Sequence, residues 1–450
     1  MLSGLKKKFY SSDTVKRQFG KYSDFNREIM SELSERVKIL AEESIGSDIK
    51  SMLDTSSLNV ENFRGKKVVH VSTWDTTCGI AAYCRALKEG LDEIGVLQAN
   101  DVISIDPDFV HHASYEENER FYNEIARKCE NYDIILVQYE FGFFASDKYY
   151  FPKDIELFYN FINKLREYNA HGKILIYIHT PLDVLGYKNV VDYFNVSKKF
   201  VELSRLKNIY FMANTLNLIT NWYFCGVKAA LGIDPVKRFY KENLFVKQDL
   251  KDKIRSRLDI KENDKILMML GFINHMKRYD EMAEILALLP ENYKLLAAGG
   301  IFPDSPDKYL KRFKNKIKNL NLEDRVYITG LFSDEDLGTY LDIADIMCAP
   351  YGKVRAGSGS IPMLLLAGKP VVAYKNDMVD SVNNQCEFKP LNEVEYDNRL
   401  MFRDTILKLA ENSQYYNECC ERIKDYSSVI SDRKLAELVL KTLEGTCLPK

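Results

Sequence analysis

The sequence predicts an α/β fold: two tandem Rossmann-like, doubly wound domains preceded by a helical N-terminal extension. From residue 66 onward, short and continuously apolar segments alternate with helical segments, as expected of parallel strands covered by helices on both faces. A charged, weakly periodic stretch from Asp234 to Asp264 interrupts this alternation once, and the alternation then restarts. A chain of 450 residues is also too long for one ordinary domain.

These patterns divide the chain into four units. We expect a helical extension over residues 1–64, a first Rossmann-like domain over 65–235, a second over 236–430, and a C-terminal helix over 431–450 that packs back on the first domain. In the extension, Ser23 and Asp24 precede an apolar i, i+4 stripe that begins at Phe25. The cluster Lys6–Lys8 fits either a contact with an anionic membrane or a solvated helix end. Residues 1–64 could equally dimerise or dock a partner.

Apolar runs mark the expected strands. In the first domain they are Lys67–Ser72, Asp133–Gln138, Lys173–Ile178 and Asn208–Ala213, with helices over Ala81–Leu91 and Leu216–Phe224. In the second domain they are Lys265–Leu270, Tyr293–Ala298, Arg325–Thr329, a strand from Ile346, and Pro370–Ala373, with helix from Asn392 to the end. Ligands of such domains bind at the carboxyl ends of the strands and in the cleft between domains.

One loop has the chemistry of an anion site. The strand from Ile346 leads into a run of small residues, Arg355–Ser360, and then into Ile361-Pro362, which predicts a helix with hydroxyl N-caps and an early proline. Free N–H groups at a helix start accept anions such as phosphate. The alternative is an ordinary strand–helix turn.

Composition excludes several classes of protein. A net charge of −2 argues against a general polyanion binder, so we expect no nucleic-acid partner. No apolar run approaches the ~18–20 residues of a membrane span, and the N-terminus lacks a signal-peptide core. The nine cysteines are odd in number and contain no CxxC pair, which indicates reduced thiols in the cytoplasm. We expect no metal site, and a protein that is cytoplasmic or peripheral to the inner face of the membrane.

Several motifs follow successive predicted strands: Cys78–Tyr83, Val137–Gly142, Ile178–Thr180, Gly271–Lys277, Ala344–Tyr351 and Ala367–Val372. Over about residues 66–445 they resemble the motifs of the family 4 nucleotide-sugar glycosyltransferases (glycosyl transferases group 1). The resemblance implies the GT-B fold, in which the first domain binds the acceptor and the second binds the nucleotide-sugar donor. It implies a donor-binding set of Gly79, Ile80, Gly271, Asn274, Lys277, Arg278, Gly330, Tyr351, Arg355, Gly357, Ser358, Gly359 and Ser360.

The sequence departs from the family pattern at Cys78, which replaces a glycine of the first loop, and at three positions on the donor side. The family usually carries two glutamates eight positions apart before its Gly-x-Pro; Arg355 and Met363 stand there. Phe272 replaces the usual arginine of the donor segment, which leaves Lys277, with Arg278 as a helper. Arg355 could supply the missing charge because a guanidinium suits phosphate.

The expected chemistry is sugar transfer from a nucleoside-diphosphate sugar to a hydroxyl of a glycan or lipid-linked acceptor. Lysine, arginine and backbone N–H groups would stabilise the leaving diphosphate without metal or other cofactor, and the resemblance implies retention of configuration. His179, Glu140 and Asp75 are the catalytic candidates of the first domain. His179 would contact the sugar or else cap the core, Glu140 would orient or deprotonate the acceptor hydroxyl or else bond a neighbouring backbone group, and Asp75 would lie on the acceptor side. The alternatives are a sugar-nucleotide 2-epimerase and a non-catalytic scaffold. Asp106 and Asp108 have a metal–diphosphate spacing, for which we favour a turn.

Overall fold

The computed structural model describes residues 49–76, 78–149, 152–182, 190–235, 244–301, 308–352 and 359–445, without the side chains of 190–193 and 224. The helix expected after Ser23 and the cluster Lys6–Lys8 lie outside the described residues, and so do Arg355, Gly357 and Ser358. Nothing in the described ranges tests the roles suggested for them.

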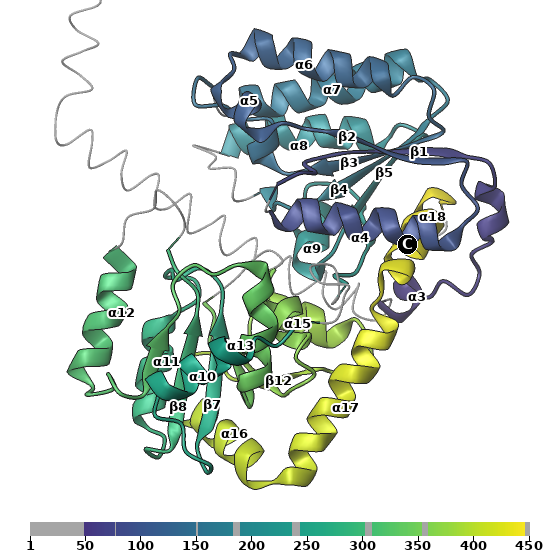
Figure 1. Cartoon of the computed structure of the whole chain (residues 1–450). Coiled ribbons are helices and arrows are strands. Elements are labelled where there is room, and N and C mark those ends of the chain that lie inside the picture. The colour runs from purple at the N-terminus through teal and green to yellow at the C-terminus, as the bar shows by residue number, and fades with distance from the viewer. Residues whose placement is uncertain are drawn as a thin grey trace, which may run out of the picture.

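The N-terminal domain is a parallel six-stranded sheet in the order β2-β1-β3-β4-β5-β6. Helices cover both faces, and buried aliphatic residues of the strands form the core (Figure 1). Its elements are α3 (Ile49–Leu53), η1 (Val60–Phe63), β1 (Lys67–Ser72), α4 (Gly79–Ile94), β2 (Ala99–Ser104), α5 (Pro107–His112), α6 (Tyr115–Lys128), β3 (Ile134–Tyr139), η2 (Phe141–Phe143), α7 (Lys153–Tyr168), β4 (Lys173–Ile178), α8 (Val190–Ser204), β5 (Ile209–Ala213), α9 (Leu216–Phe224) and β6 (Ala230–Leu231).

The C-terminal domain is a second parallel six-stranded sheet, in the order β12-β11-β10-β7-β8-β9. The prediction of two doubly wound domains is confirmed. The elements are α10 (Gln248–Arg257), β7 (Lys265–Leu270), α11 (Tyr279–Ala287), β8 (Tyr293–Ala298), α12 (Lys308–Asn319), β9 (Val326–Ile328), η5 (Asp334–Asp336), α13 (Leu337–Ile343), β10 (Ile346–Ala349), α14 (Ser360–Leu365), β11 (Val371–Tyr374), α15 (Asp377–Asn384), β12 (Leu391–Val394), α16 (Arg399–Glu411), α17 (Ser413–Val429) and α18 (Asp432–Leu443).

Two local expectations need comment. Helix from Asn392 onward was wrong at its start, because Leu391–Val394 pairs in parallel with β11 as a short edge strand. Asp106 caps α5, accepting from the N–H groups of Asp108 (3.0 Å) and Phe109 (3.1 Å), so this pair forms the turn that we favoured.

Two residues of the family-like motifs stabilise the C-terminal domain through hydrogen bonds to its backbone. The Asp345 carboxylate accepts from the N–H of Ile266 at 2.7 Å, which ties the start of β10 to β7. Lys369 donates to the carbonyls of Leu341, Asp342 and Ala344 at 3.0, 2.6 and 2.6 Å, so it satisfies the carboxyl end of α13. Both residues therefore maintain the fold.

The chain returns to the N-terminal domain at its end. α17 runs along one side of the molecule and α18 lies against α4 (Figure 1). Gly90 of α4 allows this close approach, because a Cβ there would lie 2.0 Å from the carbonyl oxygen of Asp432. Lys173 donates to the carbonyl of Leu443 at 2.6 Å and caps α18. No helix among the described residues is both long and apolar enough to cross a bilayer.

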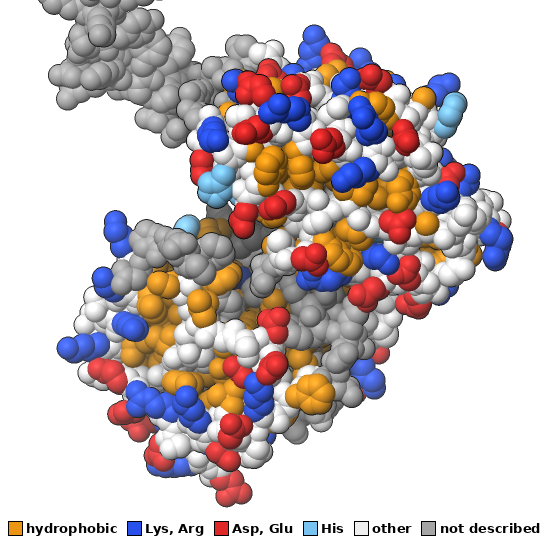
Figure 2. Space-filling model, turned by 45° about the horizontal axis from the view of Figure 1, so that its top comes forward, with side chains coloured by type: hydrophobic (Ala, Val, Ile, Leu, Met, Phe, Trp, Pro, Cys, Tyr) orange, Lys and Arg blue, Asp and Glu red, His pale blue; other side chains and the backbone are white. Residues whose placement is uncertain are grey.

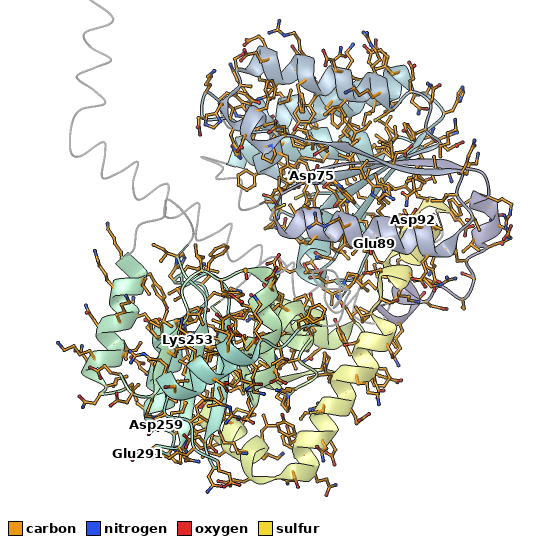
Figure 3. The ribbon with its side chains drawn as sticks, in the orientation of Figure 1. Asp75, Glu89, Asp92, Lys253, Asp259 and Glu291 are labelled. Atoms are coloured by element: carbon orange, nitrogen blue, oxygen red, sulfur yellow. The ribbon has the colours of Figure 1, made fainter. Side chains whose placement is uncertain are left out.

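The strand ends of the C-terminal sheet point toward the N-terminal domain. Asp259 and Glu291, which precede β7 and β8, lie at the far end of the C-terminal domain in Figure 3. The carboxyl ends of these parallel strands therefore face the other domain. The surface is hollowed where the two domains face one another (Figure 2). The two domains also contact one another where α9 meets α15, and the side-chain amide of Asn217 donates to Asp377 at 2.7 Å.

Candidate donor-binding site

Gly271 follows β7 and opens the space above the strand end. Its φ of 110° lies in the region that residues with a side chain rarely adopt. A Cβ at this position would lie 3.6 Å from the Ser360 hydroxyl and 3.7 Å from Cε of Lys277. The glycine therefore lets two polar side chains from separate segments meet over the end of β7.

Lys277 is the centre of this meeting point. Its Nζ donates to the Ser360 hydroxyl and lies 3.8 Å from the centroid of the Tyr351 ring. The Tyr351 hydroxyl in turn donates to the carbonyl of Leu270 at 3.2 Å. Burial lowers the pKa of Lys277 from 10.5 to about 7. We call Gly271, Lys277, Tyr351 and Ser360 the Lys277 cradle; four of the predicted donor-binding residues meet there.

The turn before Lys277 is held by Asn274. The Asn274 side chain accepts from the N–H groups of Met276 at 3.0 Å and Lys277 at 3.1 Å. Asn274 thus shapes the loop through its own backbone contacts.

The helix start at Ser360 differs from the expectation. Gly359 is the N-cap of α14, with helical φ and ψ and no side-chain cap, so a hydroxyl N-cap is wrong at this position. Ser360 is the first helical residue, and its hydroxyl accepts from Lys277 instead. The predicted anion site is therefore built around the lysine, with the helix start beside it.

Arg278 and Gly330, two further predicted donor-binding residues, are not among the four residues of the Lys277 cradle. The Arg278 guanidinium lies 3.1 Å from Glu281 and 2.5 Å from Asp397, in a network of ion pairs. Gly330 follows β9 with φ 75°, and its segment packs against Gly300 at the end of β8. Sequence reasoning missed both partners: Glu281 is the local i, i+3 neighbour of Arg278 on α11, whereas no sequence pattern links Arg278 to the distant Asp397.

On the N-terminal domain, α4 begins next to an open surface. Gly79 is the first helical residue, and nothing lies within 4 Å of a Cβ built on it. Cys78 is the N-cap, and its sulfur accepts from the N–H of Ala81 at 3.3 Å. Ile80 follows and is partly exposed. Asp75 is exposed and lies on the same side of the domain as the carboxyl end of β1 (Figure 3).

His179 and Glu140 lie at the ends of the neighbouring strands β4 and β3. His179 Nε2 is 2.6 Å from the side-chain oxygen of Gln138, and the rings of Tyr177 and Tyr83 lie at 5.3 and 5.5 Å. Glu140 accepts from the hydroxyl of Thr180, and burial raises the pKa of Glu140 although this hydrogen bond opposes the change. Gln138 is fully buried and orients the imidazole; sequence reasoning placed it only within a motif.

Two parallel six-stranded domains, with strand ends facing a hollow between them, define a protein of GT-B fold. Residues 251–426, most of the C-terminal domain, match the family described as Glycosyl transferases group 1. This match lies in the part of the chain that carries the motifs Gly271–Lys277, Ala344–Tyr351 and Ala367–Val372.

The chain is also similar to individual known proteins. Alpha-monoglucosyldiacylglycerol synthase of Streptococcus pneumoniae is 28% identical over 155 residues, and this match spans 34% of each chain, about a third of that relative's length. The crystal structure of Anabaena HepE in complex with UDP superposes with a TM-score of 0.62 at 14% identity, over 84% of this chain and all of that one. A glycosyltransferase from Rickettsia africae gives 0.62 at 16% identity, over 85% of this chain and 98% of that one. These structural likenesses show the fold.

Proposed function

We propose that the chain transfers a sugar from a nucleoside-diphosphate sugar to a hydroxyl of a lipid or glycan acceptor, without a metal and with retention of configuration. The observation that carries the proposal is the Lys277 cradle. A partly buried amine beyond the end of β7, beside the Ser360 hydroxyl and a glycine without a side chain, is suited to binding an anion.

The diphosphate is the part of such a donor that needs this amine. When the bond between sugar and diphosphate breaks, negative charge grows on the leaving oxygen, and a preplaced ammonium group stabilises it. An arriving diphosphate would raise the pKa of Lys277 again, because an adjacent anion favours the charged amine. The Ser360 hydroxyl, now engaged by Lys277, would be a second donor to a phosphate oxygen.

The comparisons favour particular substrates. The Anabaena neighbour was solved with UDP and with UDP-glucose, and the name of the Streptococcus relative describes a glucosylated diacylglycerol. UDP-glucose is therefore the first donor to try, and diacylglycerol the first acceptor. His179 lies in the N-terminal domain, where it is hydrogen-bonded to Gln138, and it is our candidate for contact with the sugar. A peripheral position on the membrane would suit a lipid acceptor.

A thermal-shift screen of nucleoside-diphosphate sugars, followed by a turnover assay, tests the proposal. A bound donor raises the melting temperature because it binds only the folded chain. Slow release of nucleoside diphosphate in the presence of EDTA supports a metal-independent transferase, and the anomeric configuration of the product reports retention. An isomerised sugar would indicate an epimerase instead. If no donor binds and none is turned over, the proposal fails, and the non-catalytic scaffold is the alternative that remains.

A further inference from the structure

Arg278, the residue after Lys277, has an unusual backbone conformation. Its φ is 54° and its ψ is 48°, in the left-handed region that arginine rarely adopts. Its carbonyl accepts from the N–H groups of Glu281 at 3.0 Å and Met282 at 3.2 Å, so the loop turns into α11 at this residue. The direction in which Lys277 leaves the loop therefore depends on an unfavourable torsion.

The side chain of Arg278 is anchored by two carboxylates and two aromatic rings. Nη2 lies 3.1 Å from Glu281 and 2.5 Å from Asp397, and the guanidinium carbon lies 5.5 and 5.2 Å from the ring centroids of Tyr374 and Tyr396. Two carboxylates thus face this one cation. Their charge offsets the attraction that Arg278 would exert on a distant phosphate.

Glu281 is itself firmly held. Its side chain is only 5% exposed, Arg399 donates to both of its oxygens at 2.8 Å, and the Tyr374 hydroxyl donates at 2.9 Å. Such a fixed partner can keep Arg278 in a strained conformation, because strain persists only where the surroundings over-determine it.

The other side of Lys277 is held as well. Asn274 accepts from the Lys277 N–H at 3.1 Å, and the carbonyl of Met276 accepts from the N–H of Gly352 at 2.8 Å. Hydrogen bonds therefore hold the segment before Lys277 against the loop that follows β10. Ion pairs hold Arg278, the residue after it, against α11 and the segment between β12 and α16.

From these contacts we propose that Arg278 is a positioning residue for Lys277 and not a second phosphate ligand. Its anchored guanidinium holds the left-handed turn that directs Lys277 into the cradle. The nucleotide-binding test of this proposal rests on the proposed function.

Two variants that both lack the guanidinium separate the two roles. Glycine adopts the left-handed region freely and alanine does not. With UDP as the probe, we expect Arg278→Gly to bind within about 3-fold of wild type and Arg278→Ala to bind about 5- to 30-fold more weakly. An equal loss in both variants would overturn the proposal, because binding would then depend on the guanidinium itself and not on the left-handed turn. Wild-type affinity in both would show that it does not position Lys277.

Asp397→Asn keeps Arg278 and removes one of its anchors. The positioning role predicts weaker UDP binding in this variant. A ligand role predicts tighter binding, since the freed guanidinium could turn to the phosphate. Unchanged or tighter binding would overturn the proposal, and this variant serves if Arg278→Ala does not fold.

A measurement without nucleotide keeps the test independent of the proposed function. In full-length protein with isotope-labelled lysine, NMR follows the titration of Lys277, assigned by its loss in Lys277→Met. The pKa of Lys277 should stay near 7 in wild type and Arg278→Gly and move toward 10.5 in Arg278→Ala. If wild type fails to bind UDP, the proposed function fails, and this titration still decides the role of Arg278. An identical titration in all three proteins would overturn it.

Discussion

Replacing Lys277 by methionine should stabilise the folded protein while removing nucleotide binding. Burial lowers the pKa of Lys277 from 10.5 to about 7. At 1.36 kcal/mol per pH unit, this difference corresponds to about 5 kcal/mol of destabilisation at and below neutral pH. The amine keeps the Ser360 hydroxyl and the Tyr351 ring as partners, so we take this value as an upper limit and expect a gain of about 1–3 kcal/mol.

The sign of the pH dependence follows from proton binding. Below pH 7 the amine is charged in both the folded and unfolded chain, so the full penalty of burial applies. Between pH 7 and 10.5 the unfolded chain binds the proton and the folded chain does not, so wild-type stability rises with pH relative to Lys277→Met. The advantage of the variant should therefore be largest at pH 6 and shrink toward pH 10.

Thermal unfolding at several pH values measures this advantage. A gain of 1–3 kcal/mol should raise the melting temperature by about 2–10 °C at pH 6. Lys314→Met on the exposed face of α12 is the matched control, and we expect no such change there. UDP binding by calorimetry should weaken about 100-fold or more in Lys277→Met. A destabilised Lys277→Met, or a difference that does not vary with pH, would refute the assignment of a buried, weakly basic amine.

Three further variants test the surroundings of the site. Gly271→Ala should weaken UDP binding at least about tenfold and lower the melting temperature, because the backbone there is left-handed and the new Cβ faces Ser360 and Lys277; calorimetry and thermal unfolding would show it, and unchanged binding would contradict it. His179→Ala should leave UDP affinity within about 3-fold while turnover of the donor falls about 100-fold, and parallel losses of both would place His179 outside the reacting groups. Glu281→Gln should lower the free energy of unfolding by about 3 kcal/mol at pH 7 in denaturant titrations. Burial opposes the charge of Glu281, but hydrogen bonds from Arg399 and Tyr374 prevail and lower its pKa. The difference should therefore begin to shrink below pH 4.5 and be lost once the pH has fallen through the lowered pKa of the folded state; a difference that does not shrink with falling pH would contradict the ion-pair account.

The long apolar strands could be predicted from sequence because a buried parallel strand has no polar face. Lys67–Ser72 and Lys173–Ile178 form strands with the predicted bounds. β6 and β12 could not be found in this way, since they have two and four residues and β12 carries Asn392 and Glu393. Their place at the sheet edge is fixed by the neighbours with which they pair, and that information is tertiary.

As with the strands, only part of the candidate site could be predicted from the sequence. Gly271 and Lys277 follow a predicted strand, so their position at its carboxyl end followed from the chain order. That Ser360 and Tyr351 meet Lys277 depends on β10 lying beside β7, which only the sheet order shows. The anchoring of Arg278 by Asp397 joins residues over a hundred positions apart, and no local pattern encodes it.

Motif residues that stabilise the fold cannot distinguish an enzyme from an inactive relative. Asp345 and Lys369 satisfy backbone groups of the sheet and of α13, so a scaffold would need them as much as a transferase. Lys277 differs, because its burial destabilises the chain and methionine would fill the same space without a charge. A scaffold gains nothing from that lysine, whereas a transferase needs a cation where the diphosphate leaves. The destabilising residue therefore favours a transferase over a scaffold more strongly than the motif residues that maintain the fold.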